Sequence, residues 1–199
     1  MLALDLDHLD QYSDHLRSRS GALVTVRFVA PEDAAALQAY FRGLSVQSRY
    51  NRLMGAASEL PAGQLDAFTH LHDDGRFSVV ATVAGDGIAT IVGEARYAFD
   101  EDTASIELGL SVADAFQRQG IGAALMANLE CRAAALGAER LFGDTLRSND
   151  AMLALARNAG FAFAPTPGDW KQVRFSKPID TVPAKIPCAA WRLLAQAAA

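Results

Sequence analysis

Apolar residues recur every three or four positions in several parts of the chain, which is the period of an α-helix. The clearest stripe runs from Ile121 to Leu136 and predicts an amphipathic helix over 120–136 that Gly137 ends. The same spacing and the helix start and stop signals predict further helices. They are expected over residues 1–20, 31–41, 45–52, 64–70, 149–159 and 188–199.

Other segments are rich in β-branched and aromatic residues and are bounded by turn residues, which is typical of strands. Residues 77–84 and 88–99 flank a Gly-Asp-Gly turn and predict a hairpin. Strands are also expected over 22–29, 103–112, 141–145 and 170–176. Some strands form consecutive hairpins and others are separated by helices. The pattern therefore predicts an α/β (α+β) fold with a mixed sheet and helices on its faces.

The length of 199 residues suits one domain with short additions at its ends. We expect an N-terminal helical extension over 1–20, a main domain over 21–178 and a tail with a short helix over 179–199. Apolar residues make up 51% and charged residues 21%, as in folded globular proteins. The start of the chain does not read as a secretory signal, and no apolar run reaches the ~20 residues that span a bilayer. We therefore expect a cytoplasmic protein without a membrane partner.

The charge and the pattern of possible metal ligands indicate which binding partners to expect. The net charge is -5 and the chain has no long basic run, so nucleic acid is not expected as a partner. The segment 70–74 holds two histidines and two aspartates, but no other ligands are placed to join them, so we expect no metal. Cys131 and Cys188 have neither CxxC nor metal-ligand spacing, and we expect two reduced thiols.

The connection after the strand that ends at Val112 carries the most information. Gly120 and Gly122 lack a Cβ, so an anion can approach their backbone closely. The first turn of the following helix has N–H groups without an internal partner, and the helix dipole favours a phosphate there. For the two glycines alone, a tight strand–helix turn is the better interpretation. No Gly-Lys-Ser/Thr follows and a third glycine is missing, which excludes a Walker loop and a dinucleotide fingerprint.

The whole pattern is more specific than the glycines. Gln117-x-x-Gly120-x-Gly122, preceded by a strand ending in Leu-Ser-Val, resembles the acyl-CoA signature of the GNAT acetyltransferase superfamily. Downstream, 149–152 and 158–161 resemble the next helix of that family, which closes with a Gly-Phe pair. This resemblance covers about residues 22–176. It implies the GNAT fold, with a sheet that splays open after the strand ending at Val112 and with acetyl-CoA as acyl donor.

Two further segments resemble a narrower group. Residues 44–52 and 93–97 are similar to segments in the GNAT domain of bacterial Pat-type protein-lysine acetyltransferases. In such proteins the domain is often fused to a cyclic-nucleotide module or an acyl-CoA-synthetase-like module, and this chain is too short for either. The similarity is therefore to a domain type and does not identify the acceptor.

The resemblance to the superfamily also implies where the coenzyme binds. Pantetheine would pair with the backbone near the end of the strand, and the pyrophosphate would lie on N–H groups at the start of the helix. Arg118 either adds a charge-assisted contact or is a solvated arginine at the helix start. The implied coenzyme-binding residues are Leu110, Ser111, Val112, Gln117, Arg118, Gln119, Gly120, Ile121, Gly122, Ala123 and Asn149.

Acyl transfer to an amine requires a base, because an amine with a pKa of ~10.4 is protonated at neutral pH. Glu107 is the first candidate, because it interrupts an apolar strand at the position where many GNAT enzymes have their catalytic glutamate. Its alternative is an exposed glutamate on a solvated face. Glu94 is the second candidate, for which an ion pair with Arg96 or with a neighbouring strand is the better interpretation. Many family members have a tyrosine acid where this chain has Ala156.

These observations predict an acyltransferase that moves an acetyl group from acetyl-CoA directly to a primary amine in a ternary complex. The amine could belong to a protein lysine or to a small molecule. One alternative is a regulatory GNAT domain that binds acyl-CoA without catalysis. Another is an interaction module, in which the tail helix over 188–199 covers the chain's own core or pairs with a second copy in a homodimer.

Overall fold

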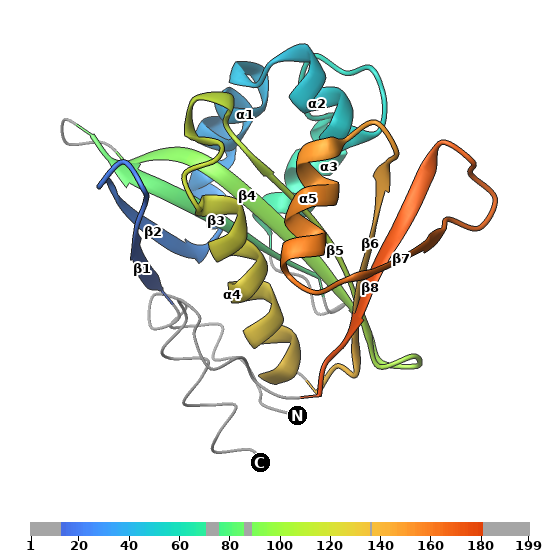
Figure 1. The fold of residues 1–199 in the computed structure, drawn as a ribbon. Coiled ribbons are helices and arrows are strands. Elements are labelled where there is room, and N and C mark those ends of the chain that lie inside the picture. The colour runs from blue at the N-terminus through green and yellow to red at the C-terminus, as the bar shows by residue number, and fades with distance from the viewer. Residues whose placement is uncertain (1–12, 71–75, 86–88, 136, 181–199) are drawn as a thin grey trace.

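One mixed sheet organises the chain (Figure 1). The computed structural model describes residues 13–180 apart from 71–75, 86–88 and 136. Within this part, eight strands lie in the order β1-β2-β3-β4-β5-β6-β8-β7, and only β5 and β6 are parallel neighbours. The strands are β1 Asp14–Arg17, β2 Leu23–Phe28, β3 Arg76–Ala84, β4 Ala89–Asp100, β5 Ser105–Val112, β6 Arg140–Leu146, β7 Ala162–Pro165 and β8 Gln172–Pro178.

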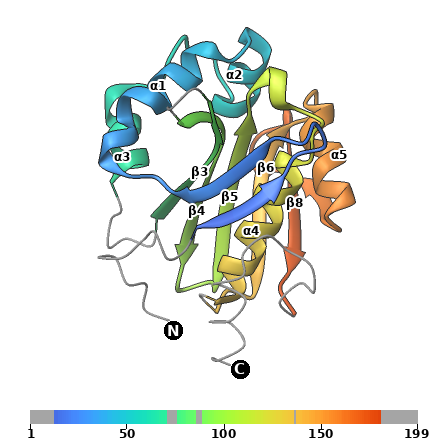
Figure 2. The same cartoon turned by 90° about the vertical axis from the view of Figure 1, so that its left-hand side faces the viewer.

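Helices cover both faces of this sheet, as Figures 1 and 2 show. Helices α4 and α5 lie on one face, and α1, α2 and α3 lie on the other. The helices are α1 Ala34–Gly43, α2 Val46–Leu53, α3 Ala62–Thr69, α4 Ile121–Ala135 and α5 Asp150–Asn158. The predicted α/β class with a mixed sheet is confirmed. No helix among the described residues is long and apolar enough to cross a membrane.

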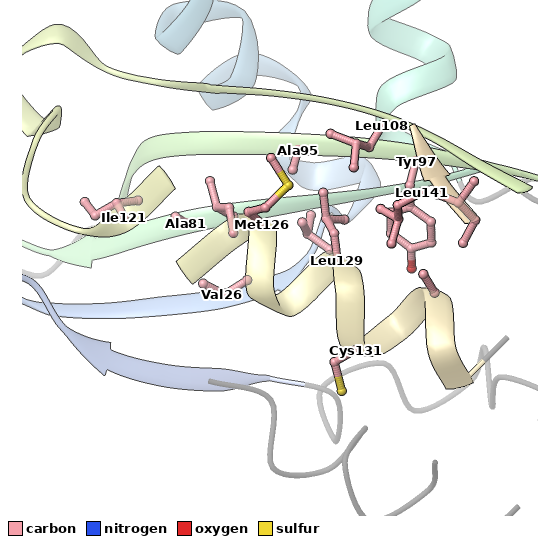
Figure 3. Close-up of a cluster of buried hydrophobic side chains, with 14 of the residues drawn as sticks. Val26, Ala81, Ala95, Tyr97, Leu108, Ile121, Met126, Leu129, Cys131 and Leu141 are labelled. Atoms are coloured by element: carbon pink, nitrogen blue, oxygen red, sulfur yellow. The ribbon is translucent and has the colours of Figure 1, made fainter. Parts of the chain in front are cut away.

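The larger core lies between the sheet and α4 (Figure 3). Successive strand residues point to opposite faces, so Leu108 of β5 faces α4 while Glu107 faces the other side. Leu125, Met126 and Leu129 of α4 are at most 1% exposed. Burying each such side chain contributes about 1.5–3 kcal/mol, so this contact fixes α4 against β4 and β5.

A smaller core holds α1 and α3 on the opposite face. Phe41 of α1 meets Phe68 of α3 edge to face, with ring centroids 5.7 Å apart. Leu37 and Val80 of the same cluster are fully buried. This core places the helices α1 and α2 beside the face of β5 that carries Glu107.

Three expectations from the sequence need correction. Asp14–Arg17 is a strand paired with β2 and not part of a helix, because exposed His15 and Arg17 alternate with buried Asp14 and half-buried Leu16. The other residues of the expected N-terminal helix up to 12, and the helix expected over 188–199, lie outside the described residues. β7 was not predicted, since its four residues form a strand only by pairing with β8.

The third correction concerns a thiol. Cys131 is disulfide-bonded and fully buried, so the expectation of a reduced thiol at this position is wrong. A disulfide requires closeness in space and not a particular sequence spacing, which is why the pattern of cysteines did not reveal it. Cys188 lies outside the described residues.

The sheet opens between β5 and β6. These two strands pair only from Ser105 to Glu107 on β5. Beyond that point β5 stays paired with β4 up to Val112, and β6 stays paired with β8 up to Leu146. The splay that the sequence predicted is therefore present, and it begins inside β5, directly after Glu107.

Gly143 lies at the point of separation. A Cβ at this position would lie 2.5 Å from Cζ of Phe175 and 2.7 Å from the carbonyl oxygen of Leu108. Phe175 is its partner across β6 and β8 and is 1% exposed. The glycine therefore makes room for an aromatic ring beside the backbone of β5.

We predict that Gly143→Ala lowers the free energy of unfolding by about 1–3 kcal/mol, because the added methyl group overpacks this point. Urea unfolding would measure the loss. Gly63→Ala in α3 is the control, since no atom lies within 4 Å of its added Cβ. If Gly143→Ala and Gly63→Ala were equally stable, the proposed packing at the separation of the strands would be wrong.

Candidate functional site

The separation of β5 from β6 opens a cleft of about 1190 Å³. The exposed part of β5 forms its floor, and α2, the start of α4 and α5 form its walls. The predicted base and most predicted coenzyme-binding residues line this cleft. They are Glu107, Leu110, Ser111, Val112, Gln117, Arg118, Gly120, Gly122, Ala123 and Asn149.

Two predicted coenzyme-binding residues do not line the cleft. The side chain of Ile121 is 1% exposed and belongs to the core below α4. The side chain of Gln119 donates to the carbonyl of Ala115 at 2.9 Å and accepts from Ser20. At these positions only the backbone N–H groups are left as contacts to a ligand.

The loop before α4 has an unusual backbone. Arg118 and Gly120 adopt left-handed φ angles of 61° and 93°. A left-handed φ is uncommon for any residue other than glycine, so the loop follows a fixed and strained path. The first hydrogen bond at the helix start joins the N–H of Ala124 to the carbonyl of Gly120 at 3.0 Å. The N–H groups just before Ala124 have no such partner in the helix and are suited to an anion.

The side chain of Gln117 links the loop before α4 to the end of β5 by a hydrogen bond. Its Nε2 donates to the carbonyl of Val112 at 3.0 Å and to Oγ of Ser48 at 3.3 Å. The end of β5 is thereby tied to α2. One backbone acceptor that we expected to serve pantetheine already accepts a hydrogen bond from the protein.

Gly122 keeps the gap between β5 and α5 open. A Cβ on Gly122 would lie 3.4 Å from Cδ2 of Leu155 and 3.8 Å from Cγ2 of Val112. Asn149 caps α5 by accepting the N–H of Met152 at 3.2 Å, and its Nδ2 donates to Thr145 at 3.1 Å. A longer side chain at position 122 would therefore enter the channel between the strand and α5.

On the face of β5 that is turned away from α4, side chains form a buried chain of hydrogen bonds. Glu94 on β4 is 1% exposed. Its Oε1 accepts from Nε of Arg52 at 2.6 Å, and its Oε2 accepts from Nη2 of the same residue at 3.1 Å. Ser111 donates to Oε1 at 2.6 Å, and the hydroxyl of Tyr40 lies 2.9 Å from Ser111 Oγ. Because the serine proton points to Glu94, Tyr40 is the donor in the second bond.

This network decides the role of Glu94. The sequence suggested a pair with Arg96 or a neighbouring strand, but the partner is Arg52 on α2, and Arg96 lies over the ring of Phe68 at 4.0 Å. Ser111 was predicted to bind coenzyme, yet its side chain serves Glu94, which leaves its backbone for a ligand. The carboxylate of Glu94 is therefore occupied and unsuited to accept a substrate proton.

The charge of Glu94 raises the pKa of both Arg52 and Tyr40. Burial alone would lower the pKa of Arg52, but the charge and hydrogen bonds of Glu94 outweigh burial, so its pKa lies above the ordinary value. Burial, and then the nearby charge of Glu94, raise the pKa of Tyr40. Tyr40 is consequently a neutral donor and Arg52 is a fixed cation.

Asp114 anchors the start of α2. It accepts hydrogen bonds from the N–H of Ser45 at 2.9 Å, from its Oγ at 2.8 Å and from Oγ of Ser48 at 2.7 Å. Burial raises the pKa of Asp114, but these hydrogen bonds outweigh it and hold the pKa below its usual value. Ser45 and Ser48 therefore have a structural role, because they join α2 to the loop after β5.

Glu107 differs from Glu94 in being exposed. It lies on the same face of β5 as Gly109 and Ser111 and lines the cleft. The guanidinium of Arg52 covers Gly109, with Nη1 3.2 Å from the place of a Cβ. The cleft thus has one solvent-accessible carboxylate on this face of β5, next to the point where the strands separate. Among the described residues, no group of three or more acidic, histidine or cysteine side chains could hold a metal.

Comparisons with known proteins agree with this geometry. A family model described as "Acetyltransferase (GNAT) family" matches residues 38–161. Acetyltransferase PA5475 of Pseudomonas aeruginosa is 29% identical over 153 residues, which cover 77% of this chain and 82% of that protein.

Solved structures share the fold. The GNAT domain of S. lividans PAT matches with a TM-score of 0.74 at 24% identity, covering 83% of this chain and 96% of that chain. RimJ of Mycobacterium smegmatis, in complex with CoA-disulfide, matches with a TM-score of 0.64 at 19% identity, covering 93% and 94%.

We predict that Arg52→Met lowers the free energy of unfolding by about 3–5 kcal/mol, because it leaves the charge of Glu94 buried without its partner. The double variant Arg52→Met/Glu94→Leu should recover most of this loss. Chemical unfolding of the two single variants and the double variant would give the coupling energy.

The exposed pair of Arg42 and Glu59 provides the control. Arg42→Met should change stability by less than about 1 kcal/mol, since surface ion pairs contribute little. Additive losses in the Arg52 and Glu94 variants would show that the buried pair is not coupled as described.

Proposed function

The chain belongs to the acetyltransferase (GNAT) family, and on this premise we propose that it transfers an acetyl group from acetyl-CoA to a primary amine. The observation that carries the proposal is the cleft between β5 and β6, which has a phosphate-binding type of loop at one end and an exposed carboxylate on its floor. Transfer is direct, within a ternary complex of protein, acetyl-CoA and amine.

Acetyl-CoA fits the cleft in two parts. The stretch of β5 after Glu107 has no strand partner on the side of β6, so amides of pantetheine can add there as a strand would. The N–H groups at the start of α4 can take the pyrophosphate, aided by the helix dipole. The similarity in fold to a protein solved with CoA-disulfide supports this placement.

Glu107 is proposed as the general base. It takes a proton from the attacking ammonium, directly or through water, so that the neutral amine can attack the thioester carbonyl. A C–N bond forms, the C–S bond breaks, and the coenzyme leaves as a thiolate. The nitrogen of the new amide gives its second proton to water, and the thiolate takes up a proton from water. Glu94 cannot share this role while Arg52 and Ser111 hold its oxygens.

The thiolate needs no tyrosine to leave. Ala156 occupies the position where many family members have that acid, and it is fully buried. A thiol with a pKa of ~8.5 is a tolerable leaving group, so water can supply the proton. We therefore propose a mechanism with a base from the protein and an acid from solvent.

The acceptor amine is proposed to belong to a protein lysine or to a small molecule. The similarity to the GNAT domain of S. lividans PAT supports the first, at the level of fold. A regulatory domain that binds acyl-CoA without catalysis is the second candidate function, favoured by the buried alanine in place of the acid.

We predict that Glu107→Gln lowers kcat by about 10²–10⁴-fold at neutral pH and leaves the affinity for acetyl-CoA nearly unchanged. The loss should shrink as the pH approaches ~10.4, where the amine deprotonates without a base. Steady-state kinetics with an amine acceptor would measure both effects.

The control for this prediction is Glu101→Gln, which removes an exposed carboxylate from the turn between β4 and β5. It should keep full activity. Unchanged turnover of Glu107→Gln would exclude Glu107 from the mechanism, and a wild-type protein that binds acetyl-CoA but transfers to no amine would favour the regulatory domain.

We predict that Gly122→Leu weakens the binding of acetyl-CoA by at least about tenfold, because the side chain fills the channel between β5 and α5. Gly122→Ala, whose Cβ makes only ordinary contacts, should bind nearly as wild type does. Isothermal titration calorimetry would compare the three proteins. Equal affinities would place the coenzyme elsewhere.

A further inference from the structure

The turn between β1 and β2 lies directly against the loop before α4. The N–H of Arg19 donates to the carbonyl of Gln119 at 3.0 Å. Ser20 donates from its hydroxyl to Oε1 of the same glutamine at 2.6 Å. A segment about a hundred positions earlier in the chain thus holds the residue that precedes Gly120.

This turn is itself rigidly built. The N–H of Ser18 donates to the carbonyl of Ala22 at 2.9 Å, and the N–H of Ala22 returns to Oγ of Ser18 at 3.1 Å. Gly21 adopts a left-handed φ of 89°, and its carbonyl accepts from Nη1 of Arg17 at 3.0 Å. The backbone of Arg19 therefore has a fixed position beside the loop.

Arg19 and Arg118 bring two positive charges to one end of the cleft. Both residues are exposed and line the cleft together with Gly120 and Gly122. In the described part of the chain, neither guanidinium forms an ion pair or a hydrogen bond to an acceptor.

Among the described residues, none of the acidic side chains that line the cleft forms an ion pair with Arg19 or Arg118. Asp114 is held by serines of α2, and Asp144 pairs with Arg174. Asp150, at the start of α5, is exposed and also lines the cleft. Two cations that line one cleft in a protein with a net charge of -5 mark a local preference for an anion that the overall charge does not provide.

We propose that Arg19 binds a phosphate group of the acyl-CoA, so that the β1–β2 turn forms part of the coenzyme site. This inference rests on the proposed function. The guanidinium of Arg19 would contact the phosphate oxygens by charge-assisted hydrogen bonds, from the side opposite to α5. Either the pyrophosphate or the 3′-phosphate of the coenzyme supplies the same chemistry.

The test compares Arg19→Gln with Arg17→Gln by calorimetry against acetyl-CoA. Both variants remove one positive charge from the same hairpin, but Arg17 does not line the cleft. Arg19→Gln should weaken binding by about tenfold, the effect of one charge-assisted contact, and Arg17→Gln by less than about twofold. Thermal unfolding of both variants would verify that the hairpin stays folded.

A second arm uses dephospho-CoA, which lacks the 3′-phosphate. If the effect of Arg19→Gln disappears with this ligand, Arg19 binds the 3′-phosphate. If the effect persists, Arg19 binds the pyrophosphate. Both results support the proposal, and they assign the contact.

Three results would overturn it. Equal affinity of Arg19→Gln and wild type for acetyl-CoA would exclude the contact while leaving the proposed function intact. If Arg19→Gln and Arg17→Gln lost the same affinity for acetyl-CoA, the loss would come from the lower positive charge of the hairpin or from a changed turn, and not from a contact of Arg19 with phosphate. Failure of the wild-type protein to bind any acyl-CoA would remove the proposed function together with this inference.

Discussion

The structure depends on a competition between strand pairs. β5 and β6 are parallel neighbours over three residue pairs, whereas β4 with β5 and β6 with β8 form longer antiparallel ladders. Antiparallel pairing is slightly stronger per residue, so each strand follows its longer ladder after Glu107. The ring of Phe175, seated on Gly143 beside the carbonyl of Leu108, fills the point where the strands part. The cleft, its floor on β5 and the exposure of Glu107 in it all follow from this separation.

Two glutamates on neighbouring strands have different environments in this structure. Glu94 is buried and its charge is compensated by Arg52, so the pair joins α2 to the sheet without adding net charge to the cleft. Tyr40 and Ser111 extend this connection to α1 and β5. Glu107 is exposed and lines the cleft, and its charge acts on Arg174, which itself pairs with Asp144.

The sequence predicted the mixed sheet, most of its elements and the loop before α4, because local periodicity and the glycine pattern carry that information. It placed Asp14–Arg17 in a helix, because spacings of three and four outweighed the short alternation of a strand, which becomes stable only by pairing with β2. The partner of Glu94 was wrong for a related reason. Arg52 lies 42 positions away, and its contact depends on how α2 packs. Arg19 could not be found either, since its link to Gln119 joins positions 100 residues apart in the sequence.

The edges of the sheet have a consequence for the behaviour of the protein in concentrated solution. Among the described strands β1 and β7 are the outermost, and each has only four residues. An outer strand exposes unpaired backbone groups to which another chain can add, and short strands limit that addition. β7 ends with Pro165, which has no N–H to donate, and β1 ends with the exposed charged residue Arg17. Both edge strands therefore limit aggregation by strand pairing between molecules, although the core of the sheet is strongly apolar.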